Sequence, residues 1–145
     1  MDDRAEITEL INRYAIATDR RQFDAVGELF TEDGQATYSG VRLDPGRAAI
    51  VAHLQPLAGF PMSQHDVGTI SITLDGDAAT ATSYTVVHLV RTAGDDHEVV
   101  HRGLSYDDRL VRTPEGWKFA ERFHQVLWST TEPTVWPVPV LTPAT

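Results

Sequence analysis

Cysteine is absent from this chain of 145 residues, and positive charge is scarce. Without cysteine there is no disulfide framework, no thiol nucleophile and no thiolate metal site. The 12 lysine and arginine residues face 21 aspartate and glutamate residues, which leaves a formal net charge of −9. Nucleic acids and anionic membrane surfaces both require a basic face, so we expect neither as a partner.

Long hydrophobic runs are missing as well. No apolar stretch approaches the roughly 20 residues that a membrane-spanning helix needs. The first six residues are acidic and polar, the opposite of a secretory signal, and we therefore expect a cytoplasmic protein. What the chain does contain is 41% hydrophobic residues, which is enough for the core of one domain of this length.

The first third of the chain carries helical patterns. A helix is predicted over about residues 3–18, where apolar residues recur at helical spacing: Ile7, Leu10, Ile11, Tyr14 and Ala15. Further helices are expected at about 23–30 and 45–54. Between them, residues 31–34 have the composition of a loop, and residues 35–39 that of a short strand.

From residue 64 onward the pattern changes to strands. Four long strands separated by glycine-containing turns are expected at about 65–74, 78–91, 98–112 and 117–130. The segment 132–145 holds four prolines and is expected to be a tail that cannot join a central strand. We therefore divide the chain into one domain, residues 1–131, and this Pro-rich tail. Helices followed by an antiparallel meander favour an α+β fold, and strands this long curl into a sheet that can enclose a pocket.

Two polar residues stand where such a pocket would form. Asp19 follows the first predicted helix, and His65 begins the first long strand. A histidine and an aspartate that meet in a pocket can act as a general base with its orienting carboxylate. The alternative for Asp19 is a helix-end carboxylate bonded to local backbone, and for His65 a strand-end imidazole in solvent.

The facing of His65 depends on the regularity of its strand. Strict alternation places His65 and Ile70 on opposite faces, which would keep the imidazole away from the apolar side. One β-bulge near Gly68 would reverse the parity and bring both to the same side. We therefore predict a bulge between residues 66 and 69.

Other side chains could complete the site. Tyr14 lies on the apolar side of the first helix, five residues before Asp19, and could instead be a core ring with a satisfied hydroxyl. Arg122 lies between aromatic residues of the last strand; it could stabilise an enolate oxygen if it points inward, or be solvated if it does not. His53 and His97 are expected in solvent. The substrate-binding candidates are aromatic or imidazole side chains of the long strands: Tyr84, His88, His101, Phe119 and Trp128.

Several kinds of site find no support in the sequence. The one His-x-x-x-His spacing, at His97 and His101, falls on a turn and a predicted strand rather than on one face of a helix, so no metal is expected. A glycine-rich phosphate loop and a Gly-x-Ser-x-Gly nucleophile elbow are also missing. We therefore expect chemistry without a cofactor.

An ordered set of motifs over about residues 3–130 resembles the SnoaL-like group of the nuclear-transport-factor-2-like superfamily. The motifs are Ile7-x-x-Leu10-Ile11-x-x-Tyr14-Ala15-x-x-x-Asp19, Phe23-Asp24-x-x-x-x-Leu29-Phe30-x-x-Asp33, Gln64-His65, Asp75-Gly76-Asp77-x-Ala79, Tyr106-x-Asp108-x-Leu110 and Gly116-Trp117-Lys118-Phe119-x-x-Arg122. The resemblance implies a conical α+β barrel, in which a curved antiparallel sheet wraps around N-terminal helices and encloses one apolar pocket. It also implies a homodimer or homotrimer.

The resemblance extends to the candidate residues. In scytalone dehydratase, lindane dehydrochlorinase and the bile acid 7α-dehydratases, an aspartate after the first helix pairs with a histidine at the start of a meander strand, and Asp19 and His65 match these positions. Tyr14 matches the dehydratase tyrosine, and Arg122 matches an arginine of the bile acid enzymes. The second catalytic histidine of scytalone dehydratase has only an approximate counterpart in His88. The pocket carboxylates of ketosteroid isomerase and limonene epoxide hydrolase have no clear match.

These observations favour a cofactor-independent lyase of the dehydratase type, or an isomerase, that acts on a small hydrophobic oxygenated molecule. His65 would remove a proton next to a carbonyl, and Asp19 would orient the imidazole. Tyr14 would donate to the carbonyl or leaving oxygen, with Arg122 as electrostatic support. The alternatives are a polyketide-type cyclase that uses the pocket for an intramolecular aldol closure, and a non-catalytic ligand carrier or assembly subunit.

Overall fold

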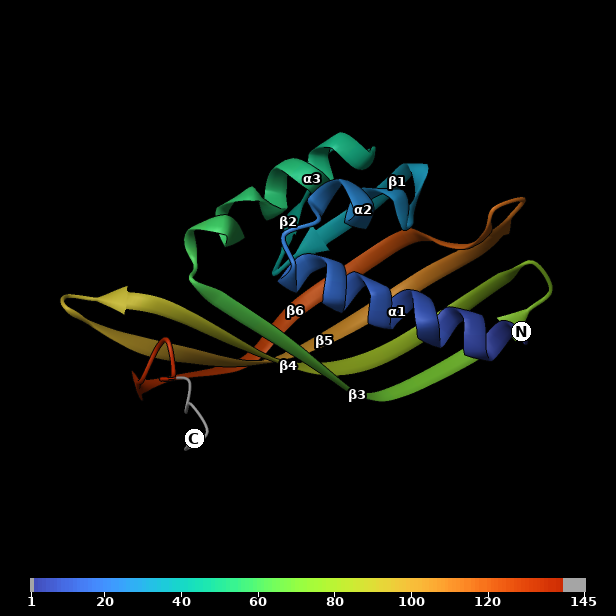
Figure 1. Ribbon diagram of the computed structural model, residues 1–145. Helices are drawn as coiled ribbons and strands as arrows, with labels where there is room; N and C mark the ends of the chain where they lie inside the picture. Colours follow the sequence, from blue (N-terminus) through green and yellow to red (C-terminus); the bar gives the residue numbers. More distant parts are fainter. Residues whose placement is uncertain (1, 140–145) are drawn as a thin grey trace, which may run out of the picture.

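Three α-helices pack across one face of a curved six-stranded sheet in the computed structural model, which describes residues 2–139 (Figure 1). The helices are α1 (Asp3–Asp19), α2 (Phe23–Glu28) and α3 (Arg47–Leu54), and the 3-10 helix η1 (Gln55–Gly59) follows α3. The strands are β1 (Phe30–Tyr38), β2 (Val41–Arg42), β3 (Met62–Asp75), β4 (Ala78–Ala93), β5 (Asp96–Thr113) and β6 (Gly116–Thr134). The α+β class is therefore confirmed.

The sheet has the strand order β2-β1-β6-β5-β4-β3. Strands β3 to β6 form the predicted antiparallel meander, because each is joined to the next by a tight turn. Strand β1 pairs with β6 in parallel, so the sheet is mixed where we expected it to be antiparallel throughout. A parallel pair needs a long connection, and here most of the chain lies between the two strands. The sheet curls around the helices without closing into a complete barrel (Figure 1).

Helix α1 forms where its pattern predicts. The Asp2 side chain caps it by accepting a hydrogen bond of 2.8 Å from the backbone N–H of Ala5. Its apolar stripe is buried against the sheet, with Ile7 fully covered. Burial of an aliphatic side chain of this size contributes about 1.5–3 kcal/mol to stability. The helix ends at Asp19, because Arg21 adopts a left-handed conformation with φ of 60°.

Helix α2 and strand β1 have different bounds from those that the local pattern predicted. Helix α2 stops at Glu28, and residues 31–34, expected as a loop, belong to β1. Pairing with β6 begins at Phe30 and shifts register before Gln35, so tertiary hydrogen bonding overrides the local turn signal. Gly34 permits this irregularity, since a Cβ there would lie 2.8 Å from the Cβ of Phe30.

The predicted bulge in β3 is confirmed. Pairing with β4 shifts register between Val67 and Ile70, and the two residues between them are exposed. His65 lies on the more buried side before the shift, as Ile72 does after it. The irregularity therefore puts His65 on the same face as the apolar residues of the strand.

Strand β6 is longer than predicted and includes Pro133, in the segment that we expected to be a tail. Pro133 pairs with Glu98 of β5, whereas β1 accompanies β6 only as far as His124. The proline therefore sits where β6 has a neighbour on one side only, and its missing N–H breaks no ladder bond on the open side. The end of the tail, residues 140–145, lies outside the described residues.

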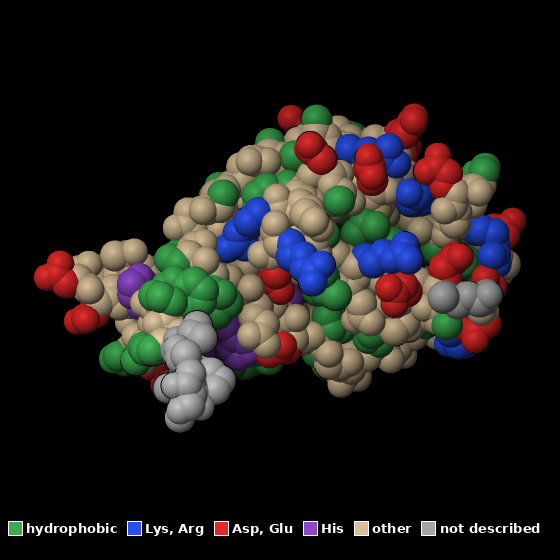
Figure 2. Space-filling view, in the orientation of Figure 1, with side chains coloured by type: hydrophobic (Ala, Val, Ile, Leu, Met, Phe, Trp, Pro, Cys, Tyr) green, Lys and Arg blue, Asp and Glu red, His purple; other side chains and the backbone are tan. Residues whose placement is uncertain are grey.

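Acidic and basic side chains are interspersed over the face of the molecule in Figure 2. Arg112 is one example, because its guanidinium lies 2.8 Å from Asp3 and 3.1 Å from Asp77. Such pairs keep the charge on this face locally balanced. Among residues 2–139, the model contains no helix with the length and apolar character needed to cross a membrane.

A buried ion pair lies inside the core. Arg122 is 1% exposed, and its Nε donates to Oδ1 of Asp108 at 2.9 Å. Its guanidinium carbon also lies 4.2 Å from the ring centre of Tyr14, 3.8 Å from that of Tyr106 and 4.5 Å from that of Phe119. Burial raises the pKa of Asp108 to about 6 against the opposing attraction of Arg122. At neutral pH the pair is therefore ionised, and each charge is the main compensation for the other.

Replacing Asp108 with alanine should lower the free energy of unfolding by about 3–5 kcal/mol, because Arg122 would remain buried without its counter-charge. Urea denaturation at pH 7.5 measures the change. Asp107→Ala is the matched control: this neighbouring carboxylate faces the other side of β5, where it accepts an exposed hydrogen bond from Thr82. The control should cost less than about 1 kcal/mol, and equal losses in the two variants would contradict a dominant role for the buried pair.

Candidate active site

A cavity of about 510 Å³ lies between the helices and the concave face of the sheet. Its walls come from α1, α3, η1 and five of the six strands. Leucine, valine, alanine, proline and phenylalanine side chains form much of the lining. The polar residues of the lining are Tyr14, Thr18, Tyr38, Ser39, His53, His65, Arg102, Tyr106 and His124. A cavity of this size and lining suits a small, largely apolar molecule that carries a few polar groups.

Asp19 and His65 meet at this cavity. Oδ1 of Asp19 lies 2.6 Å from Nδ1 of His65, and Oδ2 accepts the backbone N–H of the same histidine at 2.8 Å. The hydroxyl of Ser63 donates a third hydrogen bond, of 2.9 Å, to Oδ1. The His65 side chain is 7% exposed and lines the cavity wall. The imidazole is therefore fixed in position through both its ring and its backbone.

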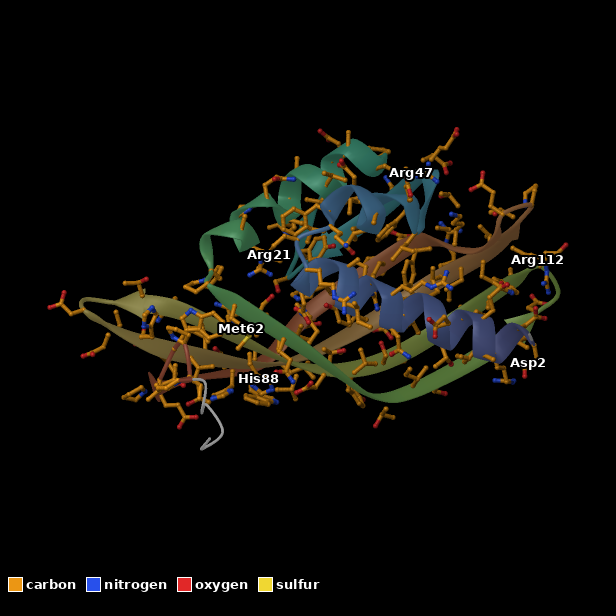
Figure 3. All side chains as sticks on the ribbon, viewed as in Figure 1. Asp2, Arg21, Arg47, Met62, His88 and Arg112 are labelled. Carbon is orange, nitrogen blue, oxygen red and sulfur yellow. The ribbon has the colours of Figure 1, made fainter. Side chains whose placement is uncertain are left out.

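Arg21 stabilises the position of Asp19 through Ser63. It follows α1 in the polar turn, and its Nη1 donates to the hydroxyl of Ser63 at 2.5 Å (Figure 3). Its Nη2 also donates to the carbonyl of Phe60 at 3.0 Å. Because the Ser63 oxygen accepts from Arg21, its own proton is directed to Asp19. Sequence reasoning missed both residues; the only available signal was a run of polar residues directly after Asp19.

The charge state of Asp19 sets the tautomer of His65. Burial opposes ionisation of the carboxyl, but hydrogen bonds from His65 and Ser63 outweigh it, and the pKa of Asp19 is lowered. Asp19 is thus a carboxylate, which can only accept hydrogen bonds, so Nδ1 of His65 carries the proton. When the ring is neutral, Nε2 keeps its lone pair and is the nitrogen available to a ligand.

Two tyrosines bring phenol groups to the same cavity. The hydroxyl of Tyr14 lies 2.6 Å from that of Tyr38, which sequence reasoning did not single out. Burial raises the pKa of both phenols above the usual value for tyrosine, so both keep their protons. One proton is used within the pair, and the hydroxyl that accepts it retains an O–H that can donate to a ligand oxygen.

Arg122 and Phe119 were expected at the site, but neither contributes to the cavity lining. Arg122 is held by Asp108 behind the rings of Tyr14 and Tyr106. Phe119 is fully buried against Phe30, with ring centres 5.2 Å apart. The cation therefore acts on the tyrosines rather than on a ligand directly.

The remaining substrate-binding candidates lie on the outer face of the sheet, away from the helices: Tyr84, His88, His101 and Trp128. On β4 the cavity is lined by Val87 and Leu89, so strand alternation turns Tyr84 and His88 to the other side. His88 is seen there in Figure 3. Nδ1 of His88 contacts Nδ1 of His101 at 2.7 Å. The indole of Trp128 covers Gly103, where a Cβ would lie 1.9 Å from its nitrogen. The prediction that these four side chains line the pocket is therefore wrong.

Two other histidines do line the cavity. His53 is exposed, as expected, but it also stacks on the ring of Tyr38 with 4.2 Å between ring centres. His124 lies on β6 between the rings of Tyr38 and Tyr106. The apolar spacing in α3 predicted His53 on the polar side of the helix, and from that side the residue also lines the cavity.

Comparisons with known proteins identify the family. The model of the SnoaL-like domain matches residues 1–123. An uncharacterised protein of Mycobacterium tuberculosis is 36% identical over 124 residues, which are 84% of each chain. A nuclear-transport-factor-2-like protein of Novosphingobium aromaticivorans with a cystatin-like fold is 34% identical, with a TM-score of 0.73 over 86% of this chain and 82% of that one.

Two further solved structures share the fold. A proposed aromatic ring hydroxylase of Novosphingobium aromaticivorans is 30% identical, with a TM-score of 0.76 over 91% of this chain and 93% of the other. A hexachlorocyclohexane dehydrochlorinase is 16% identical, with a TM-score of 0.78 over 98% of this chain and 95% of the other. At that identity the second likeness concerns the fold alone.

The tautomer of His65 can be measured by long-range ¹H–¹⁵N NMR at a pH where the ring is neutral. We expect the proton on Nδ1 in the wild type, because Asp19 accepts it. Asp19→Asn should remove this preference, since an amide can also donate. Asp66→Asn is the control, because Asp66 contacts His88 on the outer face and should leave the His65 spectrum unchanged. A proton on Nε2 of wild-type His65 would contradict the assigned hydrogen bond.

Proposed function

The chain belongs to the SnoaL-like domain family, and on that premise we propose that it is a cofactor-independent lyase or isomerase acting on a small hydrophobic, oxygenated molecule. The observation that supports this most strongly is the 2.6 Å contact between Asp19 and His65 in the wall of a largely apolar cavity. A histidine oriented by a carboxylate, with its second nitrogen free, is suited to general base catalysis.

The first step would be removal of a proton from the carbon next to a carbonyl group. Nε2 of His65 takes the proton, and the electron pair of the broken C–H bond moves toward the carbonyl. Asp19 stabilises the imidazolium that forms, because its carboxylate already accepts the Nδ1 proton. Such assistance by a positioned base is typically worth about 10²–10⁴-fold in rate.

The phenol pair would stabilise the negative charge that develops on the carbonyl oxygen. Tyr14 and Tyr38 share one hydrogen bond, and the remaining O–H donates to that oxygen. Arg122 lies behind the ring of Tyr14, where its positive charge opposes the burial that raises the pKa of this phenol. We therefore assign Arg122 a positioning and electrostatic role without contact to the substrate.

The second step would decide between the two reaction types. In a dehydration, the bond to a hydroxyl on the neighbouring carbon breaks, and the imidazolium of His65 returns its proton to form water. In an isomerisation, the same proton goes to a different carbon of the substrate. Both outcomes leave His65 neutral and ready for another cycle. The dehydrochlorinase of the same fold supports an elimination by analogy only.

Turnover can be sought with a panel of β-hydroxy ketones fused to an aromatic ring, with products identified by mass. Loss of one water indicates elimination, whereas an unchanged mass indicates isomerisation or cyclisation. His65→Ala and Asp19→Asn should each lower kcat by about 10²–10⁴-fold while circular dichroism shows a folded chain. His97→Ala is the control, since this residue lies in the β4–β5 hairpin, away from the cavity.

If both variants retain the turnover of the wild type, the proposed mechanism is wrong. Binding of the ketones without any conversion, or a stable complex with a second protein in the native extract, would favour the carrier or subunit alternative instead.

A further inference from the structure

His124 is a cavity imidazole that the proposed reaction does not use. It lies on β6, and its Nδ1 is buried without a hydrogen-bond partner among the described residues. A buried polar atom left in this state costs about 1–3 kcal/mol. Burial, followed by the positive charge of Arg122, lowers the pKa of His124 to about 4. The ring is therefore neutral at physiological pH, with one nitrogen that donates and one that accepts.

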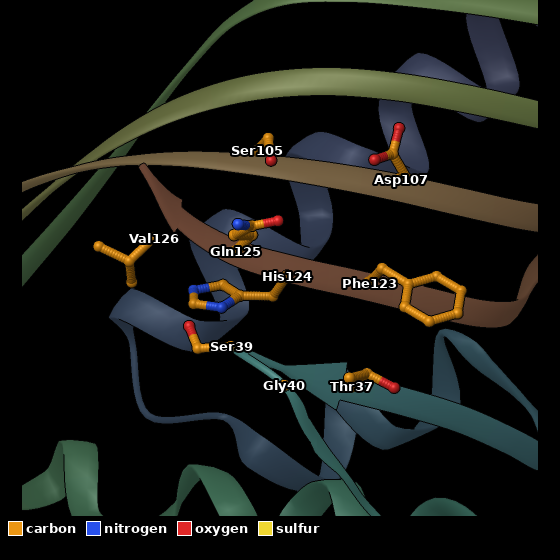
Figure 4. A pocket seen from close by; sticks show the side chains of 9 residues that line it. All are labelled: Thr37, Ser39, Gly40, Ser105, Asp107, Phe123, His124, Gln125 and Val126. Carbon is orange, nitrogen blue, oxygen red and sulfur yellow. The ribbon is translucent and has the colours of Figure 1, made fainter. Parts of the chain in front are cut away.

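The position of the ring is fixed by its neighbours. Tyr38 and Tyr106 flank it, with ring centres 5.1 Å and 5.3 Å away. The backbone N–H of Ser39 donates to the carbonyl of His124 at 2.8 Å, and Ser39 adopts a left-handed conformation with φ of 48°. In Figure 4 the hydroxyl of Ser39 is directed toward the imidazole. These contacts restrict the position of the ring.

His124 stands at one end of the cavity. Together with Ser39 and Val126 it also lines an adjoining groove of about 540 Å³ on the far side (Figure 4). His65 lies on β3, three strands away from β6 in the sheet; because the sheet curls, the two imidazoles are closer across the cavity than the about 14 Å of a flat sheet with ~4.8 Å between strands. A ligand that fills the cavity would therefore present one end to His65 and the other to His124.

We propose that His124 and Ser39 form a binding subsite for a hydroxyl group, so that the ligand of this cavity carries a hydroxyl at the end opposite the position that His65 addresses. A neutral imidazole nitrogen can either donate to or accept from a ligand hydroxyl, depending on the tautomer, and the nearby Ser39 hydroxyl can do either. Among residues 2–139, no carboxylate is bonded to His124 to activate it as a base, in contrast to His65. His124 is thus a specificity-determining residue.

The inference rests on the proposed function only in that both place a ligand in the same cavity, and it can be tested without turnover. The probes are 2-naphthol and naphthalene, which share the apolar body and differ in one hydroxyl. We expect 2-naphthol to bind about 3- to 10-fold more tightly in a fluorescence titration, as one additional neutral hydrogen bond allows. The ¹⁵N resonances of His124 should shift with 2-naphthol and not with naphthalene.

Three variants separate the possible origins of this preference. His124→Phe should bind naphthalene as well as the wild type does and lose the preference for 2-naphthol. His53→Phe removes another cavity imidazole and should keep the preference, as should His65→Ala, which abolishes the proposed reaction without touching this subsite. If His124→Phe fails to fold, His124→Gln, which retains a donor and an acceptor, should keep at least part of the preference.

Equal affinity for the two probes in the wild type would overturn the proposal, as would failure of both to bind. A preference that persists in His124→Phe, or a wild-type His124 spectrum that 2-naphthol leaves unchanged, would also overturn it. None of these results bears on whether His65 and Asp19 catalyse a reaction.

Discussion

The three hydrogen bonds accepted by Asp19 join the end of α1 to the beginning of β3, and the candidate site depends on this junction. One carboxylate satisfies the backbone of His65, orients its ring and engages the Ser63 hydroxyl. The helix ends at that point because Arg21 turns away in a left-handed conformation, and the same Arg21 then holds Ser63. The same turn therefore ends the helix and supplies the hydrogen bonds that support Asp19. Both depend on the short polar segment that follows α1.

A second constraint comes from the buried charge beneath the tyrosines. Arg122 contacts three aromatic rings and one carboxylate, and these groups hold the cavity wall around Tyr14 and Tyr106. Burying a charged pair is costly, and its cost is met by mutual attraction and by the ring faces. Arg122 is thus a fixed cation behind the cavity wall, and a ligand in the cavity does not contact it. Conversely, the outer face carries imidazoles whose nitrogens are already engaged.

Much of the fold followed from the sequence, because its signals are local. The helical stripe of α1, the glycine turns of the meander and the bulge beside Gly68 each depend on a few neighbouring residues. The bulge was predictable because only a parity change could join His65 to the apolar side of its strand. The facing of β5 and β6 was not predictable in this way. Register shifts at Gly103 and Arg109 arise from pairing between strands, which no single strand reveals.

The parallel pairing of β1 with β6 has a consequence for the order in which the protein assembles. Ala36 pairs with Arg122, more than half the chain length away, whereas the meander is built from adjacent hairpins. Contacts between distant parts of a chain pay a larger loop-closure entropy and form more slowly than local ones. Tyr38 and His124 face each other across this late contact. The hairpins with His65 can form early, and we expect the far wall of the cavity to be completed last, when β1 docks.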